Sequence, residues 1–129
     1  MTTVIKEYRL ELAGPHVEVR FRQQGLVHVN GWVKVFENSA AGGDAVLTQD
    51  VSLPPDTSWL VISADPRSLY TGNATAWLQV TNPEQDSPVQ YSIIADLKQD
   101  SENLKTFTVL QGSLAEGGAD VLDIILKFS

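Results

Sequence analysis

The amino-acid sequence predicts an all-β protein, in which one domain over residues 1–129 forms a two-sheet antiparallel β-sandwich. Three observations lead to this fold class. Apolar and polar residues alternate with a period of two in most segments, which is typical of half-buried strands. Pro or Gly interrupts the alternation roughly every eight to twelve residues. No segment carries the longer period and the end caps of a long helix.

The expected strands follow one another along the chain. Tyr8, Leu10 and Leu12 alternate with charged residues and predict a first strand that stops before Gly14. Further strands are expected over residues 17–22, 26–36, 45–53, 58–64, 75–81, 89–97, 104–111 and 119–128. Stacking of two sheets covers their apolar faces, and we expect a jelly-roll-like arrangement, with an immunoglobulin-like sandwich as the alternative.

Two of these segments need a further argument. The run that begins at Trp59 is apolar on both faces, so it is interpreted as a buried central strand. Residues 119–128 fit either a strand or a short helix. Their high content of Ile and Val after Gly117-Gly118 favours the strand.

The segment Leu26–Val35 is also ambiguous, because Asn30-Gly31 is a strong signal for a two-residue hairpin turn. A hairpin would mix apolar and polar side chains on both faces. A continuous strand instead places its valines on one face and its polar residues with Trp32 on the other. We therefore predict one strand, in which Gly31 marks a bulge or a close backbone approach. The residues expected to share the core are Phe21, Val27, Val29, Val33, Val35, Tyr91, Ile93, Phe107 and Val109.

The composition restricts the classes of function. The formal net charge of −7 would repel phosphate backbones, so we expect no binding to nucleic acid. No apolar run reaches membrane-spanning length, so no membrane association is expected. The chain has no cysteine and its first residues do not resemble a signal peptide, which together predict synthesis in the cytoplasm.

No catalytic motif is present, and no cofactor or metal is expected. There is no nucleophile elbow, phosphate-binding loop or dinucleotide fingerprint. His16 and Glu18 lack the partner cysteines of a zinc site, and we interpret them as part of a solvated strand face. Asp96, Asp100 and Glu102, with the nearby Asn103, do not have the spacing of a calcium-binding loop. We therefore expect that the protein is not an enzyme.

The candidate site is a pair of tryptophans on a polar strand face. The alternation places Trp32 and Trp77 among polar neighbours in two separate strands. The predicted interface or ligand-binding residues are His28, Asn30, Trp32, Lys34, Trp77 and Gln79. A tryptophan in such a position anchors a protein interface, stacks on a sugar ring, or packs beneath a neighbouring loop.

The resulting hypothesis is a non-enzymatic structural or assembly protein that associates with itself or with a larger protein assembly. Its most concrete form is a bacteriophage virion decoration or tail-associated subunit, incorporated into the virus particle. The alternative is a carbohydrate-binding module or lectin that uses the surface tryptophans to bind a glycan.

Overall fold

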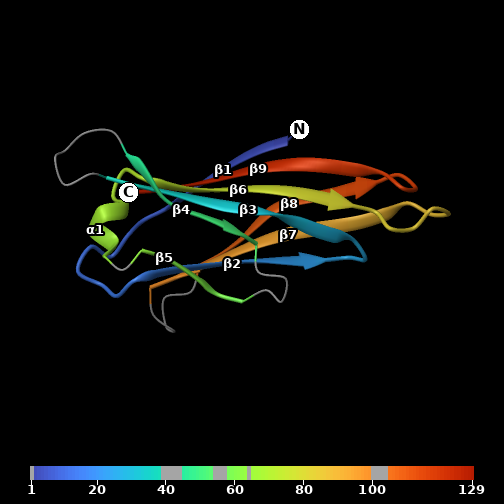
Figure 1. Cartoon of the computed structure of the whole chain (residues 1–129). Coiled ribbons are helices and arrows are strands. Elements are labelled where there is room, and N and C mark those ends of the chain that lie inside the picture. Colours follow the sequence, from blue (N-terminus) through green and yellow to red (C-terminus); the bar gives the residue numbers. More distant parts are fainter. Residues whose placement is uncertain (1, 39–44, 54–57, 64, 100–104) are drawn as a thin grey trace.

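The computed structural model describes residues 2–38, 45–53, 58–63, 65–99 and 105–129, and these residues form two sheets packed face to face (Figure 1). The five-stranded sheet has the order β1-β9-β6-β3-β4 and the four-stranded sheet the order β5-β2-β7-β8. The strands are β1 (Thr2–Tyr8), β2 (Val17–Gln24), β3 (His28–Glu37), β4 (Val46–Ser52), β5 (Leu60–Ser63), β6 (Asn73–Thr81), β7 (Val89–Lys98), β8 (Lys105–Leu114) and β9 (Ala119–Phe128).

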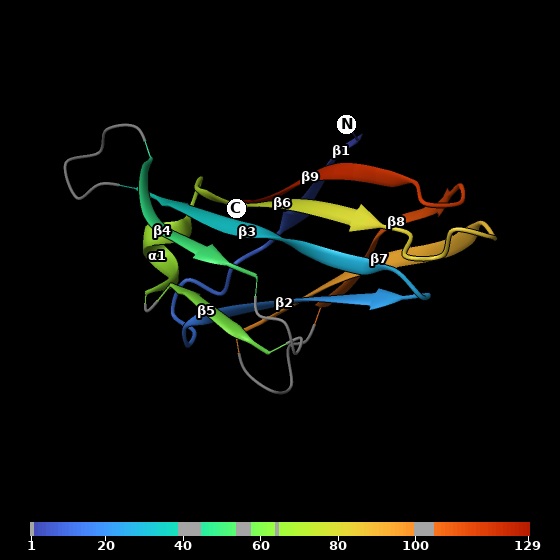
Figure 2. The ribbon, with the colours of Figure 1, turned by 45° about the vertical axis from the view of Figure 1, so that its right-hand side comes forward.

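All pairs of neighbouring strands are antiparallel except β1 and β9, which run parallel. The predicted antiparallel β-sandwich is therefore confirmed, with one parallel pair added at the edge of the five-stranded sheet. Figure 2 shows β9, β6 and β3 in one layer, with β7 and β2 in the layer beneath. The short helix α1 (Pro66–Leu69) closes one end of the sandwich.

The core lies between the two sheets and is filled by alternate residues of each strand. In β6, for example, Leu78 and Val80 are fully buried, whereas Trp77 and Gln79 are exposed on the other side. Most of the predicted core is confirmed as buried: Phe21, Val27, Val33, Val35, Tyr91, Ile93 and Val109. Val29 and Phe107 differ from the prediction, because they are only partly buried and pack against this core.

The prediction of one continuous strand through Asn30-Gly31 is confirmed by β3, which pairs with β6 without a register shift. At Gly31 the backbone of β3 lies close to that of β6. A Cβ atom at Gly31 would lie 1.9 Å from the carbonyl oxygen of Trp77, far inside any van der Waals contact. Glycine is therefore required here by the approach of β6 rather than by a turn.

Two strand predictions are wrong in position. The first strand ends at Tyr8 rather than continuing to Leu12, which is exposed beyond the end of β1. The predicted buried central strand around Trp59 is instead β5, a four-residue strand at the edge of its sheet. Its apolar residue Val61 lies opposite Glu18 of β2, on the outer face of the sheet, and is therefore exposed to solvent. The strand interpretation of residues 119–128 is confirmed by β9.

Candidate functional site

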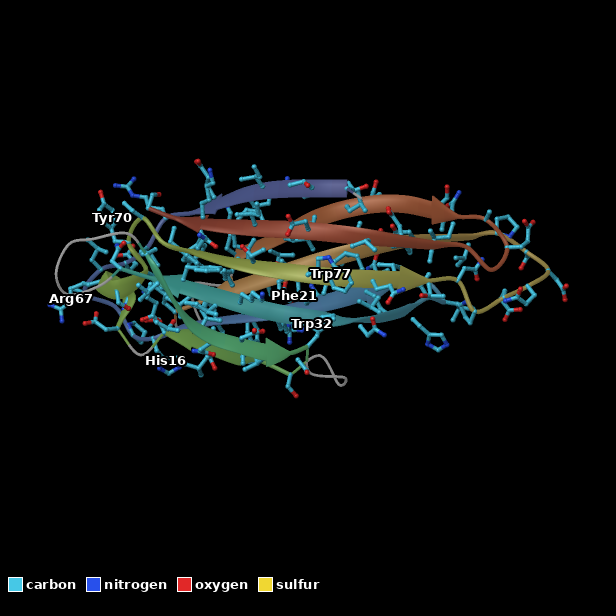
Figure 3. All side chains as sticks on the ribbon, turned by 45° about the horizontal axis from the view of Figure 1, so that its top comes forward. His16, Phe21, Trp32, Arg67, Tyr70 and Trp77 are labelled. Atoms are coloured by element: carbon cyan, nitrogen blue, oxygen red, sulfur yellow. The ribbon has the colours of Figure 1, made fainter. Side chains whose placement is uncertain are left out.

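The candidate site lies on the outer face of the five-stranded sheet. Cross-strand register places Trp32 of β3 directly opposite Trp77 of β6. The same row continues to Asp123 on β9 and to Ser52 on β4. Figure 3 shows the two tryptophans side by side on neighbouring strands of this layer. The pair thus occupies two of the three strands that have neighbours on both sides, close to the centre of the face.

The two indole rings meet edge to face. Their centroids are 4.9 Å apart and their planes are inclined by 88°. This is a favoured geometry for aromatic pairs, because the positive edge of one ring lies over the negative face of the other. Nevertheless, 46% of Trp32 and 38% of Trp77 remain exposed to solvent. The pair is therefore ordered by its own contact and still presents a large apolar surface.

The tryptophans form part of the wall of a shallow hollow of about 390 Å³. Its remaining lining residues are Lys34 and Thr75, which face each other across β3 and β6, and Asp123 on β9. The hollow thus combines two aromatic rings with an ammonium group, a hydroxyl and a carboxylate. This mixture can bind an apolar group and hold it in orientation through a few polar contacts.

The other predicted site residues share the face but lie at increasing distance from the hollow. Asn30 and Gln79 are exposed and oppose each other, one step along the face from the tryptophans. His28 is exposed at the start of β3, opposite Thr81. The structure therefore brings Trp32, Trp77 and Lys34 into the hollow and leaves the other three beside it.

Sequence reasoning missed two lining residues of the hollow. Thr75 lies two residues before Trp77, so the period of two could have predicted that it shares the face of Trp77. Asp123 belongs to β9, and no local pattern indicates that β9 pairs with β6. The same face carries charges of both signs. Lys34 lies opposite Asp50 of β4, and Lys127 lies opposite Glu7 of β1. Asp123 adds a negative charge to the lining of the hollow itself.

The outer face of the four-stranded sheet is built differently, around the fully buried carboxylate of Asp96 on β7. Its oxygens accept hydrogen bonds from Arg20 Nε at 2.6 Å, from Arg22 Nε at 2.6 Å and Nη2 at 3.1 Å, and from Thr106 Oγ1 at 2.8 Å. Burial alone raises the pKa of this carboxyl. The hydrogen bonds from Arg22, Arg20 and Thr106 outweigh burial and lower the pKa to about 2.

Trp59 extends this ionic network. The guanidinium carbon of Arg20 lies 4.5 Å and Lys98 Nζ 4.1 Å from the centroid of the Trp59 ring, so two cations stack on one indole. Glu18 Oε2 in turn lies 3.7 Å from Lys98 Nζ and 3.7 Å from His16 Nε2. The third tryptophan is therefore occupied by side chains of its own chain.

The described part of the chain contains no cluster of three or more His, Cys, Asp or Glu residues that could hold a metal ion. Asp96 is held by its arginines, and Asp100, Glu102 and Asn103 lie outside the described residues. Within the same ranges, no helix is long and apolar enough to cross a bilayer. Comparisons with protein families, with curated proteins and with solved structures found no match.

Proposed function

We propose that the chain is a non-enzymatic structural or assembly protein whose contact surface is the outer face of the five-stranded sheet. The observation that carries the proposal is the Trp32–Trp77 pair, exposed near the centre of this face. Energetically dominant residues of protein interfaces are enriched in Trp and cluster near the interface centre, within a polar rim. Asn30, Gln79 and Lys34 supply such a rim around the pair.

The dimensions of the face suit a protein partner. Five strands spaced about 4.8 Å apart, with about 3.3 Å per residue along each strand, give a surface of roughly 600 Å². A standard protein interface buries about 800 Å² on each partner. The face together with its rim therefore approaches the area that a specific contact needs, whereas a small ligand would cover only the hollow.

The specific form of the proposal is a bacteriophage virion decoration or tail-associated subunit. A sandwich that presents one open sheet face can attach to a larger particle without any catalytic group. The absence of cysteine in the chain and its net charge of −7 are compatible with synthesis in a reducing cytosol and with solubility before assembly. Double-sheet sandwiches of the jelly-roll type also build viral capsids, which supports this form of the proposal.

A second candidate function is glycan binding, and the hollow beside the tryptophans favours it. An indole face stacks on the apolar C–H edge of a sugar ring. Lys34, Thr75 and Asp123 would then donate or accept hydrogen bonds to the hydroxyl groups of the same sugar. The same tryptophans serve both candidates, so the experiment must separate a protein partner from a sugar.

Solution mass by light scattering tests the first candidate. We expect the wild-type chain to form a trimer or larger assembly, and Trp32→Ala to reduce this mass while leaving the thermal unfolding curve nearly unchanged. Tyr70→Ala is the matched control, because Tyr70 is a 49% exposed aromatic residue next to α1, outside the five-stranded sheet. A mass that Trp32→Ala does not alter contradicts assembly through this face. A wild-type monomer whose tryptophan fluorescence is quenched by oligosaccharides favours the glycan candidate.

A further inference from the structure

The sandwich has four edge strands, and three of them carry features that discourage pairing with another chain. β1 contains Lys6 and Glu7, and β5 has only four residues. β4 carries Asp50, and the amide of Gln49 donates to the carbonyl oxygen of Val61 on β5, which links the two edges. Charged side chains, short length and covered edges are the usual means by which proteins avoid edge-to-edge association.

The fourth edge, β8, is long and nearly uncharged. It runs over ten residues, and its only charged residue is Lys105 at the beginning. Among the described residues, β8 pairs with β7 alone. Its free side therefore offers backbone groups over a length that could pair with another strand.

We propose that β8 pairs antiparallel with β8 of a second copy of this chain, so that the two four-stranded sheets become one eight-stranded sheet across a two-fold axis. The axis passes between Val109 and Leu110, which places Thr108 opposite Gln111 of the second copy. An isologous contact of this kind closes after two chains. It uses a different surface from the five-stranded face and does not depend on the function proposed above.

A β-bulge on β8 makes this register possible. Ile93 of β7 pairs with Leu110 and Ile94 with Thr108, so Val109 is the extra residue. In a regular strand, a two-fold axis between two residues would bring outward side chains opposite inward ones. The extra residue shifts the alternation, so that Thr108 and Gln111 both point outward, as their pairing with Ile94 and Ser92 requires.

The side chains brought together in this register are complementary. Outward-facing Thr106 meets Ser113 of the second copy, and such hydroxyl pairs stabilise neighbouring strands. Inward-facing Phe107 meets Gly112, which has no side chain to obstruct the ring. In its own chain Gly112 already lies against Tyr91, where an added Cβ would be 3.1 Å from the phenol ring. Each pair occurs twice across the axis.

The charges at the two ends of β8 also match. Antiparallel pairing places the beginning of one β8 beside the end of the other. Lys105 therefore lies diagonally across from the exposed Glu116, which follows β8 in the second copy. Diagonal neighbours on adjacent strands are within reach of long side chains. The overall charge of −7 opposes association, and these two ion pairs reduce that repulsion locally.

Charge substitutions at the central pair test the contact, with sedimentation equilibrium as the measurement. Thr108→Lys combined with Gln111→Lys places lysines directly opposite one another twice, and we expect the dimer dissociation constant to rise about tenfold or more. Thr108→Lys combined with Gln111→Glu should restore it. Val46→Lys combined with Thr48→Lys adds the same charge at exposed positions of β4, at the edge of the sandwich away from β8, and should leave dimerisation through β8 unchanged.

The test is also made in the Trp32→Ala background, which separates β8 pairing from any contact through the five-stranded face. There we expect a species of twice the chain mass of 14.1 kDa. Unfolding curves of all variants are compared with the wild type, because Thr108 and Gln111 are exposed and their substitution should not affect the monomer fold. A monomer at all concentrations, or a dimer that tolerates the double lysine variant, overturns the proposal.

Disulfide formation tests the register, since the chain has no cysteine of its own. An equimolar mixture of the Thr108→Cys chain and the Gln111→Cys chain should form a covalent dimer under mild oxidation. Neither variant alone should do so, because identical positions lie three residues apart along the paired strands, beyond the span of a disulfide. Equal cross-linking in the single variants and in the mixture overturns the proposed register.

Discussion

Asp96 provides a quantitative test of how the four-stranded face is stabilised. The proposed perturbation is Asp96→Asn, which keeps the shape of the side chain and removes its charge. The pKa of Asp96 is about 2, against an ordinary value of 3.8. Each pH unit between these values corresponds to about 1.4 kcal/mol, so ionisation of Asp96 contributes roughly 2 kcal/mol to folding at neutral pH.

The sign of the pH dependence follows from the lowered pKa. The unfolded chain takes up this proton near pH 4, whereas the folded chain takes it up only near pH 2. The stabilisation is therefore fully present above about pH 4 and is lost as the pH falls from about 4 towards 2. Asp96→Asn has no such proton to bind, so its stability should fall less steeply than that of the wild type over this interval.

Urea denaturation at a series of pH values measures both effects. At pH 7 we expect Asp96→Asn to lower the free energy of unfolding by roughly 2–4 kcal/mol, because Arg20 and Arg22 lose their shared partner. This loss of stability is at the lower end of the range for breaking a buried ion pair. The reason is that 29% of the Arg20 side-chain surface and 37% of the Arg22 side-chain surface remain exposed to water. Asp86→Asn, at an exposed carboxylate, is the control and should change little. Parallel pH profiles for Asp96→Asn and wild type would refute this reasoning.

Three further predictions concern the fold and its partners. Gly31→Ala should lower the free energy of unfolding by several kcal/mol, roughly 2–4, because the new Cβ would meet the Trp77 carbonyl oxygen; equal urea midpoints for variant and wild type would contradict this. Leu78→Ala removes a fully buried side chain and should cost about 2–5 kcal/mol in the same measurement, whereas a loss below 1 kcal/mol would argue against this core. Duplex DNA should show no binding by fluorescence anisotropy at physiological salt, and a salt-sensitive micromolar complex would overturn the charge argument.

The sequence predicted best those features that depend on the alternation within a single strand. The alternation in β3 and β6 correctly predicted that Trp32 and Trp77 are exposed, and the alternation in β3 also predicted that Val33 and Val35 are buried. These assignments need only the period of two, because successive side chains of a strand point to opposite faces. Even the role of Gly31 follows from the same argument, once the hairpin is rejected on the sorting of its neighbours.

The sequence was least informative where a side chain depends on a distant strand. Trp59 resembled part of a central strand, since nothing local indicates that Arg20 and Lys98 stack on its ring. The contribution of Asp123 to the hollow requires the pairing of β9 with β6, and the hydrogen bonds of Asp96 with Arg20 and Arg22 require the pairing of β7 with β2. The environments of Trp59, Asp123 and Asp96 all depend on the pairing of strands that are distant in the sequence. No local pattern in the sequence indicates that pairing.

The two outer faces of the sandwich differ in how far their charged and aromatic side chains are paired with other groups of the same chain. On the four-stranded face, Asp96 is surrounded by hydrogen-bond donors and Trp59 is stacked by cations. Asp96 and Trp59 are thus already paired within the chain. On the five-stranded face, Trp32 and Trp77 pack edge to face against each other and keep about two-fifths of their surface in water. Removal of this apolar area from water is favourable, so a partner gains more by covering the five-stranded face.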